Sequence, residues 1–223
     1  MSRERTPIRL PVCALGLAGV MLAPGVHAAT VISEALYDAA GTDNGNVFVE
    51  LYGSPGMALD GLSLEGVNGT DGSVYLTLPL SGTIPGDGVF VVADDAGDGS
   101  TLVGNADLVV NMDFQNGPDS IVLRDAAGIL DALGYGDFAS GVFAGEGNAA
   151  PDAPAGSSLA RFDPLTDSDD NLRDFTVLDT PTPGSVPVSA VPLPPALGLF
   201  LSGIVGMCAV ARKRNVSPAY SPT

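Results

Sequence analysis

Short runs of alternating apolar and polar residues fill the middle of the chain, from residue 30 to residue 185. In "VFVELYG" the alternation places Val47, Val49 and Leu51 on one face of a strand, and Phe48 and Glu50 on the other. The same rule fits "SVYLTL", "GVFVVAD", "DLVVNM", "SIVLRD" and "ILDALGYG", which are separated by turn sequences such as "NGTDGS", "IPGDG" and "QNGPDS". No long helical period occurs in this span. The spacing therefore predicts an all-β fold, a β-sandwich.

The N-terminal segment has a different pattern, in which three arginines precede an apolar stretch from Leu10 to Ala23. This stretch is short for a membrane span, and small residues follow it at Val26 and Ala28. A basic start, an apolar middle and a small-residue end are typical of a secretory signal peptide. The sequence predicts a signal peptide over residues 1–28, cleaved between Ala28 and Ala29, and hence an exported protein.

A second apolar run lies near the C-terminus, where Leu193 to Ala211 includes 19 residues without a charge. As a helix this run would be about 28 Å long, enough to cross the hydrocarbon of a bilayer. Arg212, Lys213 and Arg214 follow it directly and would remain on the cytoplasmic side. The pattern predicts one C-terminal transmembrane helix, which leaves a permanent anchor and a removable signal as alternatives.

The stretch "VPLPPALGLFLSGIVGMCAVARKR" resembles the PEP-CTERM sorting signals of Gram-negative bacteria that make exopolysaccharide. Val191, Pro192 and Pro194 match the family's V-P-x-P start, and the basic cluster matches its end. Leu193 stands where a glutamate is commonest, and the tail 215–223 is longer than expected. The resemblance implies passage through the secretion translocon, residence in the inner membrane, cleavage near the proline motif by an exosortase, and transfer to the cell surface. A permanently anchored periplasmic binding module is the alternative.

Charge and composition restrict the chemistry of the middle segment, which contains 25 acidic residues and three bases, Arg124, Arg161 and Arg173. Such a body repels phosphate backbones, so nucleic acid is an unfavourable partner, whereas polycations and divalent metals are favoured. The segment also has no histidine, cysteine or lysine. Ser-His-Asp and Cys-His catalysis, histidine metal sites and lysine Schiff bases are therefore excluded there. Carboxylate chemistry remains, and a glycan hydrolase that uses a pair of acids stays open as an alternative.

One acidic loop, "DPLTDSDDNLRDF", is a candidate calcium site because calcium prefers oxygen ligands on loops. It is not an EF-hand, since Leu172 and Leu178 occupy the positions of the turn glycine and of the last carboxylate. The alternative is that these oxygens accept hydrogen bonds within turns and that Arg161 and Arg173 pair with the acids. The candidate ligands are Asp163, Asp167, Asp169, Asp170, Asn171 and Asp174.

The order of the predicted strands over residues 30–185 resembles the lamin-tail domain, which is an immunoglobulin-like β-sandwich. Four blocks carry the resemblance: "VISEALYDAAGTDNGNVFVELYG", "LDGLSLEG", "QNGPDSIVLRDAAGILDALGYGD" and "GSSLARFDPLTDSDDNLRDFTVLDTPTPG". Leu62 stands where a tryptophan is common, and no Cys pair or Trp is available to fix the core. The fold implies no particular ligand.

These observations divide the chain into a signal peptide (1–28), a lamin-tail-like sandwich (30–185), a linker (186–192), a sorting signal with its helix (191–214) and a tail (215–223). We expect an exported, non-catalytic structural or adhesive protein whose partners are exopolysaccharide or envelope proteins.

Overall fold

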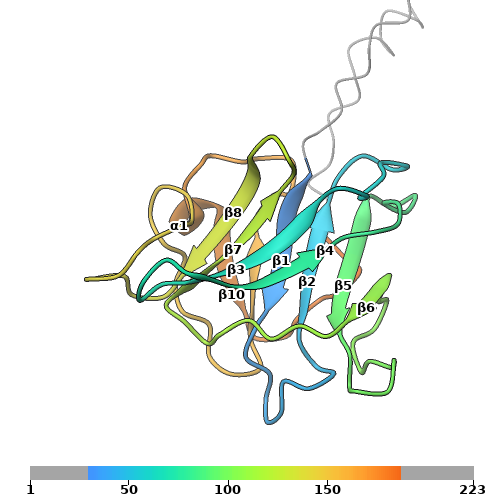
Figure 1. Ribbon diagram of the computed structural model, residues 1–223, viewed down its shortest axis with the longest axis horizontal. Coiled ribbons are helices and arrows are strands. Elements are labelled where there is room, and N and C mark those ends of the chain that lie inside the picture. The colour runs from blue at the N-terminus through green and yellow to red at the C-terminus, as the bar shows by residue number, and fades with distance from the viewer. Residues whose placement is uncertain (1–29, 187–223) are drawn as a thin grey trace, which may run out of the picture.

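The computed structural model describes residues 30–186, which form two β-sheets and a single short helix (Figure 1). The elements are β1 (Val31–Leu36), β2 (Phe48–Tyr52), β3 (Ser63–Asn68), β4 (Val74–Pro79), β5 (Val89–Asp94), β6 (Leu108–Val110), β7 (Asp119–Arg124), β8 (Ile129–Tyr135), β9 (Ser158–Arg161), α1 (Asn171–Asp174) and β10 (Phe175–Leu178). The six apolar runs named above each contain one strand, so the prediction of an all-β fold is confirmed.

The strands are arranged in a six-stranded sheet, β10-β9-β1-β2-β5-β6, and a four-stranded sheet, β4-β3-β7-β8. Neighbouring strands are antiparallel except β5 and β6, which are parallel. In Figure 1, β3 and β4 pass in front of β1 and β2, so the two sheets form two layers. One hydrophobic cluster contains side chains from both sheets, among them Leu51, Leu64 and Leu133, all fully buried. The fold is thus a two-layer β-sandwich.

Two tyrosines connect the layers inside the core. Tyr37 follows β1 of the larger sheet, Tyr135 ends β8 of the smaller one, and their rings stack with centroids 4.0 Å apart. Both hydroxyls are satisfied, since Tyr37 donates to Asp152 at 3.0 Å and Tyr135 donates to the carbonyl of Gln115 at 2.6 Å. Aromatic stacking of this kind adds about 0.5–1.5 kcal/mol beyond the area that it buries. The pair connects the two sheets in a body that has no cysteine.

The face of the larger sheet that points away from the core is also covered. Glu50 lies on the opposite face of β2 from Val49 and Leu51, yet all three residues are fully buried. Alternation alone would place such a glutamate in water, because antiparallel sheets commonly have one solvated face. The residues after β10 cross this face and cover Glu50, as described below.

The segments at the two ends lie outside the described residues. These include the signal peptide with Val26, Ala28 and Ala29, and the run from Leu193 to Ala211. Within residues 30–186, no helix is long and apolar enough to cross a membrane.

Candidate functional site

Arg161 lies at the centre of the densest charged cluster in the described part of the chain. Its guanidinium is fully buried and donates to both oxygens of Asp131, at 2.9 and 3.0 Å. The Asp131 carboxylate is also fully buried. A second guanidinium nitrogen donates to Asp174 at 3.0 Å and to Asp167 at 3.2 Å. Hydrogen bonds between ionised groups are roughly twice as strong as those between neutral groups.

The strands explain how these groups meet. Arg161 ends β9 in the larger sheet, whereas Asp131 lies on β8, the edge strand of the smaller sheet. The backbone of Ile32 on β1 completes the arrangement, because its N–H donates to Asp131 and its carbonyl accepts from the Arg161 Nε at 3.1 Å. The ring of Phe175 lies 4.7 Å from the guanidinium carbon, a cation–π distance. The ion pair therefore bridges the two layers.

The acidic loop that is the candidate calcium site lies around this centre, and its side chains contact protein groups. Asp163 accepts from Leu165 N and Thr166 Oγ1. Asp170 accepts from the backbone and side chain of Asn148, and Asp174 accepts from Ser168 as well as from Arg161. Asp169 has a φ of 52°, which a short polar side chain tolerates in a turn. The pairing expected for Arg161 is present, whereas Arg173 makes no ion pair within residues 30–186.

Asn171, another of the candidate calcium ligands, makes hydrogen bonds with both ends of its side-chain amide. Its side chain is buried, and its amide donates to the carbonyl of Ala132 on β8 at 2.7 Å. Its oxygen accepts from Gly134 N at 2.8 Å and from Glu146 N at 2.9 Å. The amide therefore acts as an additional pairing partner along the free edge of β8. Covering an edge in this way blocks pairing with other chains.

Glu146 completes a group of carboxylates that the sequence alone did not bring together. Oxygens of Asp131, Glu146 and Asp167 lie within 4.8 Å of one another, the spacing of a metal-binding group. Only Asp167 belongs to the predicted calcium set. The Oε2 atom of Glu146 is buried without a hydrogen-bond partner in the described residues. Desolvation, and after it the negative charge of Asp131, raises the pKa of Glu146 to about 8.

The nearby charges add to the effect of desolvation on the pKa of Glu146. Asp131, Glu146, Asp167 and Asp174 surround a single guanidinium, so one positive charge faces four carboxylates. Since like charges at short range disfavour ionisation, the group with the fewest donors holds its proton. That group is Glu146, whose raised pKa favours the protonated form at neutral pH. A protonated acid beside a carboxylate is also the arrangement of a glycosidase, but Asp131 is fully buried and bonded to Arg161, where no sugar could reach it.

A second buried acidic pair lies on the larger sheet. Glu34 on β1 and Glu50 on β2 are opposite each other in the strand register, and both are almost completely buried. Residues 179–186, which we call the closing strap, supply donors to both. Thr182 donates to Glu34 through its N–H at 2.8 Å and its hydroxyl at 2.7 Å, and Gly184 N donates to Glu50 at 2.7 Å.

Local sequence explains the shape of the strap. Thr182 to Ser185 form a turn closed by a 3.0 Å hydrogen bond from Ser185 N to the carbonyl of Thr182. Pro183 and Gly184 occupy its centre, and Gly184 has a φ of 82°, as a type II turn requires. The side chain of Asn105 donates to the carbonyl of Pro183 at 2.9 Å. The turn thus presents its amides to the two glutamates.

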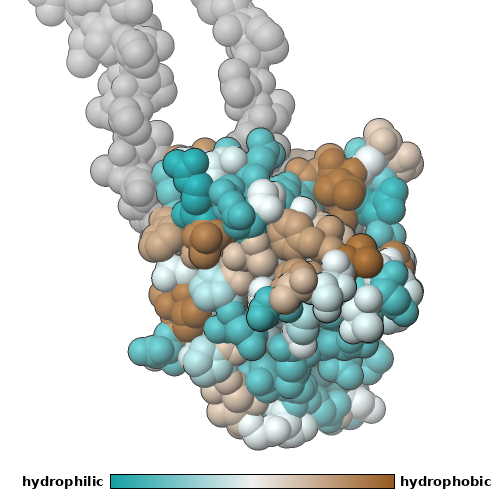
Figure 2. All heavy atoms as spheres, turned by 90° about the vertical axis from the view of Figure 1, so that its left-hand side faces the viewer, coloured by the Kyte–Doolittle hydropathy of each residue, from teal (hydrophilic) through white to brown (hydrophobic). Residues whose placement is uncertain are grey.

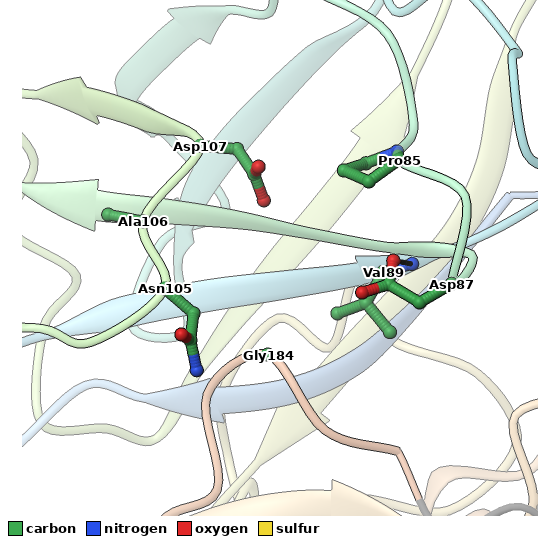
Figure 3. Close-up of a pocket in the computed structure, with 7 residues that line it drawn as sticks. All are labelled: Pro85, Asp87, Val89, Asn105, Ala106, Asp107 and Gly184. Atoms are coloured by element: carbon green, nitrogen blue, oxygen red, sulfur yellow. Dashed lines mark hydrogen bonds between the residues drawn. The ribbon is translucent and has the colours of Figure 1, made fainter.

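Two polar cavities open on the described body, each about 350 Å³. The first lies beside the strap, where Asp87, Asn105, Asp107 and Gly184 surround it (Figure 3). Asp87 and Asp107 each use one oxygen to accept from a β5 amide, at Val89 and at Val91. The second cavity is lined by Thr42, Asp43, Asn44, Asp94, Asn111, Met112 and Asp113. Buried Asp94 there accepts from Gly45 N and Met112 N.

The surface near α1 and β8 mixes both kinds of residue. Figure 2 views the side of the molecule on which these two elements lie, and its hydrophobic residues form small groups separated by hydrophilic ones. The large exposed apolar side chains of the described chain include Leu130, Phe162, Leu165 and Leu172. Scattered apolar residues are normal for a protein surface and do not define a binding face.

The remaining predicted positions, the sorting motif of Val191, Pro192, Leu193 and Pro194 with Arg212, Lys213 and Arg214, lie outside the described residues. No protein-family model, curated protein or solved structure matches this chain.

Proposed function

We propose that this chain is an exported, non-catalytic structural or adhesive protein of the cell surface or exopolysaccharide matrix. In this proposal its body is a lamin-tail-like, immunoglobulin-like sandwich, and an exosortase sorts it through the C-terminal signal. The observation that carries the proposal is the use of the buried acids. Asp131, Glu34 and Glu50 all hold elements of the fold together, so they are not available to a substrate. A rigid acidic module on a C-terminal tail is suited to display.

The intact mass of the protein from its own host, compared between membrane and surface fractions, tests this proposal. A surface form that begins at Ala29 and ends between Val191 and Pro195 supports sorting. A form that runs to Thr223 and stays in the inner membrane supports the permanently anchored binding module instead.

The glycan hydrolase is the alternative that Glu146 favours, because a carboxyl group with a pKa of about 8 can act as a general acid. Purified protein should be incubated with the host's own polysaccharide, and the Glu146→Gln variant should be assayed in parallel. We expect no release of reducing ends from either protein. Release by the wild type that disappears in the variant would refute the non-catalytic proposal.

A further inference from the structure

The closing strap has an unusual attachment for the last segment of a domain. Its turn, Thr182 to Ser185, is not paired with a strand and is fixed by side chains: Glu34 on β1 and Glu50 on β2 accept from it, and Asn105, between β5 and β6, donates to it. Val186 packs against the hydrophobic core. The chain therefore leaves the domain from the middle of the larger sheet and not from its edge strand β10.

This attachment sets the length of the tether to the predicted sorting motif. From Val186 to Val191 the chain advances by five residues, which reach about 18 Å at most. A domain of this length has a radius of gyration of about 15 Å. An enzyme acting at the motif would meet the folded body at close range.

We propose that the docked strap restrains processing of the C-terminal segment, and that the strap must undock before a membrane-bound protease or transpeptidase can cut there. This inference rests on the proposed function. Undocking residues 179–186 adds eight residues, or about 28 Å, to the tether without breaking the pairing between β10 and β9. Glu34 and Glu50 thereby act on processing from a distance, by holding the strap.

The geometry favours undocking and redocking of the strap on its own domain over docking on a second copy of the chain. Only Asp179, Thr180 and Pro181 connect β10 to Thr182, and the four steps from Leu178 to Thr182 reach about 14 Å at most. Such a connection is too short to carry the turn to the glutamates of a second copy while β10 stays in place. Three hydrogen bonds from the turn to the two carboxylates hold it, so weakening one bond should shift the docking equilibrium measurably.

The test compares Thr182→Val with Thr180→Val in the full chain. Valine at 182 removes the hydroxyl bonded to Glu34, whereas Thr180 is exposed and makes no side-chain hydrogen bond in the described chain, which makes it a matched control. Gly184→Ala is an independent second variant, because a Cβ there would lie 2.6 Å from the Asn105 Cβ and the φ is positive. Amide hydrogen exchange of residues 182 and 184 measures docking, and pulse-chase mass analysis in the host measures processing.

We expect exchange at both amides to accelerate about tenfold in Thr182→Val, as the loss of a hydrogen bond to a charged group implies, and processing to accelerate in the same direction. Gly184→Ala should do the same, and Thr180→Val should match the wild type. Faster exchange with an unchanged processing rate would overturn the inference but leave sorting intact. Unchanged exchange in both variants would overturn it at the first step. A wild-type chain that is never shortened would refute the proposed function itself.

Discussion

Replacing Arg161 by methionine should destabilise the fold more than any other single charge removal in the body. The change keeps much of the side-chain volume and removes the only cation within residues 30–186 that pairs with Asp131. Both side chains are fully buried, and breaking such a pair leaves an uncompensated charge, which costs about 3–5 kcal/mol. The free energy of unfolding of a domain is about 5–15 kcal/mol, so the loss should be a large share of it.

Urea denaturation followed by far-UV circular dichroism measures the effect, since the chain has no tryptophan to report by fluorescence. Arg124→Met is the matched control. Arg124 makes a 3.2 Å pair with Glu65, but its side chain is 41% exposed, and exposed pairs contribute about 0–1 kcal/mol. A cost below about 1 kcal/mol for Arg161→Met, similar to that of the control, would show that the buried pair does not hold the sheets together.

The double variant Arg161→Met, Asp131→Leu separates two explanations of a large cost. Apolar replacement of a whole buried pair is often neutral or stabilising. We therefore expect the double variant to be about 2 kcal/mol more stable than Arg161→Met alone, because no charge remains unpaired at position 131. If the two changes instead add, the cost comes from lost packing around Phe175 and not from the stranded carboxylate.

Three further predictions concern other parts of the network. Burial raises the pKa of Glu50 to about 6, and that of Glu146 lies near 8, so the folded state binds more protons than the unfolded state. The free energy of unfolding should be highest near pH 4.5 and fall as the pH rises to 8.5, by about 2 kcal/mol from Glu50 alone. Glu146→Gln should flatten this profile above pH 7. A urea midpoint that rises between pH 4.5 and 8.5 would contradict the raised pKa values of the two glutamates. Asn171→Ala should cost about 3 kcal/mol, because three backbone groups at β8 and Glu146 lose their partner, whereas exposed Asn148→Ala should cost less than about 0.5 kcal/mol. Calcium at millimolar concentration should leave the melting temperature unchanged, since the loop oxygens already accept protein hydrogen bonds; an increase that Asp167→Asn abolishes would support the calcium hypothesis instead.

The strands were predictable because they depend on short-range patterns. Alternation in "VFVELYG" and the glycine and aspartate turns around it locate β2 without any knowledge of its partners. The burial of the Glu50 side chain was not predictable from that pattern. Its burial depends on Gly184, which lies 134 positions away along the chain. Periodicity describes one strand and its faces, whereas the cover of a face is set by tertiary contacts.

In the candidate site, too, the local contacts were predictable from the sequence and the long-range contacts were not. A run of acids in one loop was visible in the sequence, and the pairing of Arg161 with Asp167 and Asp174 follows from their proximity along the chain. The partner that matters most, Asp131, is 30 residues away on another sheet. Glu146 looked like an ordinary surface acid, because nothing in "AGEGN" signals that its oxygen is buried beside two other carboxylates.

The burial of Arg161 also changes the electrostatics of the surface. Residues 30–186 contain only three bases, and the side chain of one of them, Arg161, is fully buried. Arg124 is paired with Glu65, which leaves Arg173 as the single cation of the described chain outside an ion pair. Many of the remaining acids, such as Asp71, Asp95 and Asp98, accept hydrogen bonds from turn amides. The surface is therefore more uniformly negative than the composition suggests. A surface of this kind stays soluble at high density and attracts cationic partners over a Debye length, which is about 8 Å at physiological salt.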